Sequence, residues 1–330
     1  MPFDKSVVVP LDPAATFALI TQPDRLRRWL AVTARLELRA GGEYRWTVTP
    51  GHVAAGSVVD VEAGRRVVLT WGWTDGDPEP GASTVTVTLT PVDGGTEVRL
   101  VHDGLTDDQA ARHAVGWNHY LDRLVVAGMC GDAGADEWAA TPEQLDELSS
   151  AEATLAILQH VLRRLDASDL TKRTPCTEYD VAALADHLLR SIATIGAAAD
   201  AALPARDESA PLETQVADAA QAVLEAWRRR GLAGKVHLAA TEVPAVLPAG
   251  ILSLEFLVHA WDFAQATRRP VSVAGPLSEY VLGIANRVIT PDARGYAGFA
   301  DEAETGPDAA AFDRLIAFTG RHPDFVASAK

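Results

Sequence analysis

Hydrophobic and polar positions divide the chain into two parts with different periodicities. Before about residue 130, apolar residues alternate with polar ones, as in Tyr44, Trp46 and Val48. This period of two is typical of half-buried strands. From Ser150 onward, apolar residues recur every three or four positions, which indicates amphipathic helices. The pattern predicts a strand-rich α+β domain followed by an all-α domain.

The first part begins and ends with well-marked elements. A strand at Ser6–Val9 precedes a helix with Asp12 as its N-cap and Pro13 at its first position. Gly41-Gly42 predicts a hairpin turn, and Thr106 begins a long helix. Further strands are expected at residues 56–61, 66–73, 83–91 and 96–102. Together these elements predict one antiparallel sheet curled around one long C-terminal helix.

The second part predicts a four-helix bundle with a C-terminal extension. The four helices are expected at 151–165, 180–198, 212–230 and 249–267, with two more at 276–289 and 307–320. Residues 131–148 are polar and small, so we expect a linker there, with a short helix from Pro142. The predicted domains are therefore residues 1–130 and 149–330, joined by this linker.

Composition and charge narrow the classes of partner. The 330 residues exceed what one ordinary core supports, and 48% of them are hydrophobic. A net charge of -16 disfavours nucleic acids and anionic membranes as partners. No signal peptide or stretch of membrane-spanning length is expected, the longest small-apolar run being 192–203. With its cysteines, Cys130 and Cys176, in separate domains, the chain is expected to be cytoplasmic.

Three polar residues lie in apolar helices of the second part. Glu255 and His259 are four residues apart in GILSLEFLVHAWDFAQA, so they share one helix face, and His187 lies in VAALADHLL. Buried carboxylates and imidazoles need partners. Two histidines and one carboxylate would form a three-ligand divalent-metal site. A hydrogen-bonded Glu–His pair and a satisfied core histidine are the alternatives.

The first part resembles a known superfamily. Its segments VPLDPAATFALIT, AGGEYRW, GSVVDVEAGRRVVLTW, STVTVTLTPVDGGTEVRLVHDGL and HAVGWNHYLDRL are similar to START-like (SRPBCC) domains of the Aha-type activator-homologue branch, over residues 3–128. The resemblance implies a helix-grip fold around an apolar ligand cavity. Trp46, Trp71 and Trp117 are candidates to line it, although they could also be core residues.

The second part resembles another family. TPCTEYDVAALADHLLRS, LEFLVHAWDFAQATRRP and DAAAFDRLIAFTGRHP are similar to the DinB-like group that contains mycothiol-dependent maleylpyruvate isomerases, over residues 150–325. The resemblance implies that His187, Glu255 and His259 ligate a divalent metal ion, commonly zinc. Thr241 departs from the family, whose members often have glycine there, which puts the loop before the fourth helix in doubt.

Each of four other residues near these motifs has two possible roles. Asp262 would orient an imidazole, or form a cap or ion pair elsewhere. Arg321 would bind a substrate carboxylate, or form a structural ion pair. His160 would be a fourth ligand, or a satisfied histidine. Cys176 would be a nucleophile at a helix N-terminus, or a small buried residue that fixes a turn.

Two functions from different classes follow. The first is a metal-dependent isomerase or transferase that acts on a small organic substrate with mycothiol or another low-molecular-weight thiol. The second is a non-catalytic small-molecule-binding or stress-response protein with a structural or sensory metal site. A co-chaperone role is a weaker third option, and a homodimer stays open.

Overall fold

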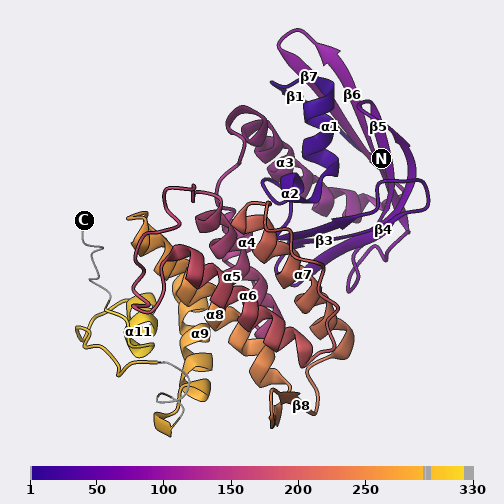
Figure 1. Cartoon of the computed structure of the whole chain (residues 1–330). Coiled ribbons are helices and arrows are strands. Elements are labelled where there is room, and N and C mark those ends of the chain that lie inside the picture. The colour runs from indigo at the N-terminus through magenta and orange to yellow at the C-terminus, as the bar shows by residue number, and fades with distance from the viewer. Residues whose placement is uncertain (1, 293, 295–298, 323–330) are drawn as a thin grey trace. The chain divides into compact units, whose positions relative to one another are not determined.

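A computed structural model describes residues 2–292, 294 and 299–322 (Figure 1). Two compact units divide the chain, unit 1 (Met1–Asp136) and unit 2 (Glu137–Lys330). The division falls inside the predicted linker, whose first six residues belong to unit 1. Asp136 lies 3.0 Å from the His119 ring there, and Arg123 donates hydrogen bonds to the carbonyls of Gly134 and Ala135. Pro323 of the TGRHP motif and the rest of the tail lie outside the described residues.

The short helix expected from Pro142 lies elsewhere, as α4 (Glu137–Ala140). Asp146 explains the difference, because it caps the next helix and accepts hydrogen bonds from the amides of Leu148 and Ser149. Ser149 accepts one in return from the Asp146 amide, which completes a capping box. The residues after Pro142 thus lead into this cap and start no helix of their own.

The described residues of unit 1 form one antiparallel sheet of seven strands in the order β1-β7-β6-β5-β4-β3-β2. The strands are β1 (Phe3–Val9), β2 (Thr33–Leu36), β3 (Glu43–Thr49), β4 (His52–Glu62), β5 (Arg66–Trp71), β6 (Ser83–Val92) and β7 (Gly95–Asp103). Inward and outward residues alternate along β6 and β7, as the period of two predicts. β1 pairs with β7, so the first and the last strand are neighbours.

The helices of unit 1 are α1 (Pro13–Thr21), α2 (Pro23–Leu26) and the long α3 (Asp107–Cys130) in the part of the chain that the structure describes. Asp12 caps α1 and Thr106 lies at the start of α3, both as predicted, and Gln109 completes a capping box with Thr106. Gly128 lets α3 approach β1 closely, because a Cβ there would lie 2.4 Å from Val9 Cγ1. A large antiparallel sheet with a long closing helix is consistent with a helix-grip fold.

Unit 2 is mainly helical (Figure 1). Besides α4, its helices are α5 (Glu147–Leu162), α6 (Val181–Ala197), α7 (Leu212–Arg230), α8 (Val246–Ala266), α9 (Gly275–Val288) and α11 (Ala311–Phe318). α5 packs against α7 and α8, and α6 packs against the same two helices. α9 packs against α8 and α11. The predicted break at 231–248 contains a hairpin that the sequence analysis missed, formed by β8 (Lys235–Leu238) and β9 (Thr241–Pro244).

α8 is more apolar than the sequence analysis allowed. Among the described residues it is the one helix long and apolar enough to cross a membrane by length and composition, with a mean hydropathy of 1.3. The prediction that no stretch approaches this length overlooked it. However, 78% of the 18-residue window of α8 with this hydropathy is buried inside the protein, and α8 contacts α5, α6 and α9. These contacts are those of a core helix.

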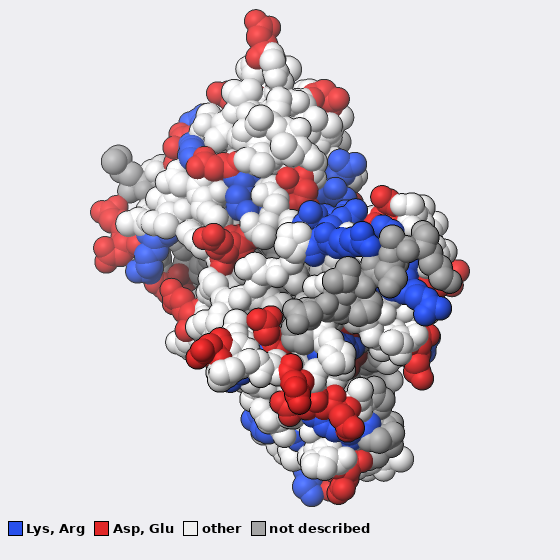
Figure 2. Space-filling model, turned by 90° about the vertical axis from the view of Figure 1, so that its left-hand side faces the viewer, with Lys and Arg blue, Asp and Glu red and all other residues white. Residues whose placement is uncertain are grey.

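Charged side chains of both signs occur on the face shown in Figure 2, among uncharged ones. Several of the exposed charges form local ion pairs, such as Arg99 with Asp4 at 2.5 Å and Arg66 with Asp60 at 3.0 Å. Exposed pairs of this kind contribute little to stability. The ion pairs that bear on function are the buried ones.

Candidate functional site

The packing of α6 on α8 brings the three predicted metal ligands together. One ligand atom each of His187, Glu255 and His259 lies within 4.8 Å of the other two. The two imidazole rings are 5.3 Å apart and perpendicular. Glu255 Oε2 is 3.6 Å from His259 Nε2, which is too long for a hydrogen bond. The cluster therefore brings two imidazoles and a carboxylate close together, with Glu255 and His259 in an ion pair that is too long for a hydrogen bond.

Glu255 is the least satisfied member of the cluster. Its Oε2 atom is buried and has no hydrogen-bond partner among the residues the structure describes. Burial opposes the charge, but interactions with His259 and Ser191 outweigh burial and lower the pKa of Glu255 below its usual value. The His259 ring at 3.6 Å is a cationic neighbour, but a buried anionic oxygen without a hydrogen bond still costs free energy unless a donor or a metal cation lies closer to it.

Asp262 orients His259 from the opposite side of the ring. The Asp262 side chain is fully buried, and its Oδ2 lies 2.9 Å from His259 Nδ1. Arg321 donates two hydrogen bonds of 2.8 Å to the same carboxylate, from Nε to Oδ1 and from Nη2 to Oδ2. Because this fork is the strongest geometry for an arginine and a carboxylate, the Arg321 guanidinium is already engaged. Its contacts are those of the structural ion pair, not of the predicted substrate-carboxylate site.

The pKa values of the two histidines of the cluster are shifted in opposite directions. Burial disfavours the charged form of His259, but Asp262 and Glu255 outweigh burial and raise the pKa of His259 to about 9. Burial, followed by repulsion from His259, lowers the pKa of His187. In these surroundings His259 is cationic at neutral pH and His187 is neutral. A metal ion would have to compete with the His259 proton.

The remaining candidates lie outside the ligand group. His160 is in the last turn of α5 and is not part of the three-residue cluster. Cys176 is half-buried, and burial, only partly opposed by Arg321, raises the pKa of its thiol. A raised pKa keeps the thiol protonated and disfavours a nucleophilic role. Tyr179, which the sequence analysis did not single out, stacks on His187 with ring centroids 5.2 Å apart.

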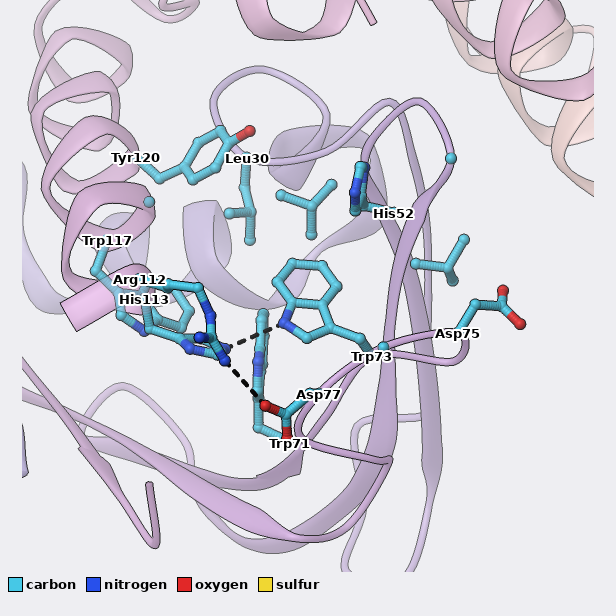
Figure 3. A pocket seen from close by; sticks show the side chains of 15 residues that line it. Leu30, His52, Trp71, Trp73, Asp75, Asp77, Arg112, His113, Trp117 and Tyr120 are labelled. Atoms are coloured by element: carbon cyan, nitrogen blue, oxygen red, sulfur yellow. Dashed lines mark hydrogen bonds and ion pairs between the residues drawn. The ribbon is translucent and has the colours of Figure 1, made fainter. Parts of the chain in front are cut away.

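Unit 1 contains a cavity of about 390 Å³ (Figure 3). Its walls come from α3, the end of β5 with the following loop, and the β3–β4 turn. The lining residues are Leu30, Val48, Gly51, His52, Val53, Trp71, Trp73, Asp75, Gly76, Asp77, Arg112, His113, Gly116, Trp117 and Tyr120. Trp71 and Trp117 line the cavity as expected. Trp46 does not line it but packs beside Trp71 and Tyr44, with ring centroids 6.0 and 4.5 Å away.

Two histidines that sequence analysis did not assign to the cavity support its walls. Trp117 Nε1 donates to His102 Nδ1 at 3.0 Å, and the other ring nitrogen of His102 lies 2.8 Å from Ser83 Oγ. Trp73 Nε1 donates to His113 Nε2 at 3.1 Å, and His113 Nδ1 donates to a backbone carbonyl. Burial lowers the pKa of His102 to about 3 and also lowers that of His113. Both imidazoles are therefore neutral, with every ring nitrogen engaged.

Charges at this cavity are confined to exposed side chains. Asp77, in the loop after β5, accepts hydrogen bonds from Gln109 and from Arg112, the latter at 2.9 Å. Both partners of the Arg112–Asp77 pair are mostly exposed, at 60% and 67%. Figure 3 shows this pair together with the Trp73–His113 hydrogen bond. The pair ties the loop to the first turns of α3.

Comparison with known proteins identifies the first unit. Residues 10–127 match the family described as activator of Hsp90 ATPase homolog 1-like protein. Two uncharacterized proteins of Mycobacterium tuberculosis, from strains CDC 1551 and H37Rv, are each 28% identical over 180 residues, 54% of this chain and 98% of theirs. Because 180 residues exceed the length of unit 1, which ends at Asp136, these matches extend into unit 2.

Three solved structures are similar to parts of the chain. An AHSA1-like protein from Rhizobium etli is 33% identical and covers 44% of this chain and 91% of its own, with a TM-score of 0.36. DynU16, from the dynemicin biosynthetic locus, is 22% identical with a TM-score of 0.37. The match covers 40% of this chain and 48% of DynU16. The Aha1 dimer of Colwellia psychrerythraea is 18% identical over 40% of this chain and 98% of its own, with a TM-score of 0.35.

Proposed function

Residues 10–127 form an AHSA1-like, START-like domain, and we propose that it is joined to a DinB-like four-helix bundle that holds a divalent metal ion for a thiol-dependent isomerase or transferase. The bundle consists of α5, α6, α7 and α8, and His187, Glu255 and His259 are the ligands. The pairwise packing of these helices and the gathering of the three side chains support the proposal. Zinc is the expected metal, and mycothiol or another small thiol the expected cosubstrate.

The residues fit a zinc ion. Two imidazole nitrogens and one carboxylate oxygen form a donor set that zinc accepts, and three protein ligands leave a position for water or substrate. The single observation that carries the proposal is the buried Glu255 Oε2, which has no hydrogen-bond partner in the described part of the chain although it lies beside two imidazoles, 3.6 Å from His259 Nε2. A bound cation would satisfy that oxygen and replace the proton of His259.

The chain's own residues hold the site in one geometry. Asp262 fixes the Nδ1 side of His259, which leaves Nε2 directed to the ligand position, and Arg321 fixes Asp262 in turn. A divalent ion bound there would supply Lewis acidity, which lowers the pKa of a coordinated thiol or water. Tyr179 covers one face of His187 and thereby shields that ring from water.

Elemental analysis of the purified full-length chain tests the metal site. Wild-type protein should carry about one equivalent of a divalent metal, and His187→Ala and His259→Ala should lose it. His160→Ala is the control from the same unit and should retain the metal. Equal trace metal in all four proteins would rule out the site. Thiol consumption that stops on chelation would then distinguish an enzyme from a structural or sensory site.

The cavity of unit 1 favours a second function, non-catalytic binding of a small molecule. Its volume of about 390 Å³ and its aromatic walls suit an apolar ligand. Gly116 offers a direct test, because it lines the cavity and a Cβ there would meet nothing within 4 Å. Gly116→Leu should fill the space and abolish binding of a probe such as 2-ethylnaphthalene. Gly283→Leu, at an equally open helical position in unit 2, should leave binding unchanged.

A further inference from the structure

The two histidines of the unit 2 cluster are oriented by different kinds of contact. Asp262 lies 2.9 Å from Nδ1 of His259 and fixes that ring from one side. Within the described part of the chain, no residue forms a hydrogen bond with a ring nitrogen of His187, which is half-buried. Metal-bound histidines usually donate their second ring N–H to an acceptor that sets the ring orientation. For His187, the orientation must therefore come from packing.

Two aromatic rings pack against His187. The Tyr179 ring stacks on it, with centroids 5.2 Å apart and planes 23° from parallel. The His259 ring meets it edge-on, with centroids 5.3 Å apart and planes at 89°. Since His259 is a candidate ligand, Tyr179 is the ring outside the ligand set that restricts His187. Rotation of the imidazole out of the stack would drive its edge into the tyrosine ring.

Tyr179 is itself fixed by the turn that precedes α6. Its N–H donates to the Cys176 carbonyl at 2.9 Å, and its carbonyl accepts a hydrogen bond of 2.8 Å from the Thr174 hydroxyl. Thr174 is buried, and the next residue in the chain, Asp180, caps α6. The backbone of Tyr179 is therefore attached to the start of the helix that carries His187.

The aromatic ring of Tyr179 makes this contact, and its hydroxyl forms no hydrogen bond with another residue in the described ranges. Phenylalanine at this position would keep an aromatic face against the imidazole. Leucine would fill part of the same space without such a face. The two substitutions therefore separate stacking from the mere filling of volume.

We propose that Tyr179 is a positioning residue of the metal centre, whose stacked ring holds the His187 imidazole in the orientation that binds the metal. This inference rests on the proposed metal site and deepens it. Tyr179 contributes no ligand atom. It acts before the metal binds, because an imidazole that is already held in place loses less conformational freedom when it becomes a ligand.

The zinc affinity of the full chain, measured by competition with a chelating dye, tests the positioning role. Tyr179→Leu should weaken zinc binding about twofold to tenfold, which is the effect of ordering one side chain on binding. Tyr179→Phe should restore the wild-type affinity. Tyr280→Leu is the control, because Tyr280 is a half-buried tyrosine of α9 outside the cluster, and this variant should bind zinc as the wild type does.

Proton NMR of the metal-free chain tests the stack without any metal. The face of a tyrosine ring shields protons that lie over it, so the His187 ring protons should resonate upfield of those of an exposed histidine, His237. The loss of these signals in His187→Ala assigns them. The upfield shift should persist in Tyr179→Phe and disappear in Tyr179→Leu.

The outcomes distinguish the positioning role from the metal site. Wild-type zinc affinity in Tyr179→Leu, or an equal loss in Tyr179→Phe or Tyr280→Leu, overturns the role of Tyr179 while the metal site stands. A wild-type chain that binds no zinc overturns the metal site and the positioning role with it. Where the leucine variant does not fold, the wild-type spectrum decides, because His187 ring protons without an upfield shift overturn the stack itself.

Discussion

In unit 1 the rings of His102 and His113 lie 4.9 Å apart, and in unit 2 those of His187 and His259 lie 5.3 Å apart, both pairs perpendicular. By separation alone, the pair in unit 1 would be the better metal candidate. Its nitrogens, however, all have hydrogen-bond partners and no carboxylate lies between the rings. In unit 2 a buried carboxylate oxygen without a hydrogen-bond partner lies beside the two rings.

The difference shows that the pKa values of two buried histidines in one chain can shift in opposite directions. Burial with neutral partners drives the pKa of His102 down to about 3, whereas burial beside Asp262 and Glu255 raises the pKa of His259 to about 9. The identity of the partners, not the depth of burial, decides the sign. An aromatic cavity and a charged cluster therefore use the same residue type for different purposes.

Breaking the buried ion pair of unit 2 should have the largest effect. Arg321→Met removes two hydrogen bonds and one of the cations that face the fully buried Asp262, which then relies on His259, so the free energy of unfolding of unit 2 should fall by about 3–5 kcal/mol. Hydrogen exchange of α8 measures this without interference from unit 1. The double variant Arg321→Met, Asp262→Leu should recover part of the loss. A decrease below about 1 kcal/mol would mean that the pair is not structural.

Metal binding should stabilise unit 2 alone. At a free zinc concentration a hundredfold above the dissociation constant, its free energy of unfolding should rise by about 2.7 kcal/mol. Hydrogen exchange with zinc and with chelator measures the change for each unit separately. Glu255→Gln should abolish the response. A response of equal size in unit 1 would contradict the contrast between the two histidine pairs.

The hydrogen bond from Asp262 to His259 should tune metal affinity. Asp262→Asn should weaken zinc binding about 10- to 100-fold, as measured by competition with a chelator, because the imidazole loses its orienting carboxylate. Asp169→Asn is the matched control, since Asp169 is also a buried aspartate of unit 2 but pairs with Lys172 and Arg269. An equal loss in both variants would indicate a general effect on folding.

Acid should destabilise unit 1 through His102. Its pKa is about 3 in the folded protein, below the usual 6.5, so only the unfolded chain binds this proton between those values. Stability is therefore complete above about pH 6.5 and decreases by about 1.4 kcal/mol per pH unit as the pH falls toward 3. Urea unfolding of unit 1 across this range measures the slope. His102→Gln should flatten it, and an unchanged slope would assign the effect to other groups.

Much of the fold was predictable because its signals are local. The caps at Asp12 and Thr106 and the apolar spacing of the bundle helices lie within a few residues of the elements they define. The β8–β9 hairpin was missed because its strands have four residues each, so that the alternation along β8 is too short to stand out and β9 has none. α8 begins earlier than predicted, at Val246, since Pro248 is tolerated in a first helical turn.

The sites were predictable to different extents. The shared face of Glu255 and His259 follows from helical geometry, and the choice of His187 as a candidate ligand follows from its apolar surroundings. In contrast, the neutral state of His102 and His113 depends on Trp117, Ser83 and Trp73, which come from other elements. The alternation of Val98, Leu100 and His102 along β7 does place this histidine on the inner face, and was the available signal. The Arg321–Asp262 pair had no local signal.

The Arg321–Asp262 pair has a consequence for the order in which unit 2 matures. Its partners are 59 residues apart, and Arg321 is synthesised after all three candidate ligands. Until that late segment folds back, Asp262 has His259 as a partner but lacks the two Arg321 hydrogen bonds, so the orientation of both side chains is less constrained. A nascent or clipped chain would therefore hold metal loosely. At the proposed metal site, Arg321 would thus make the orientation of His259 depend on the docking of the last helices.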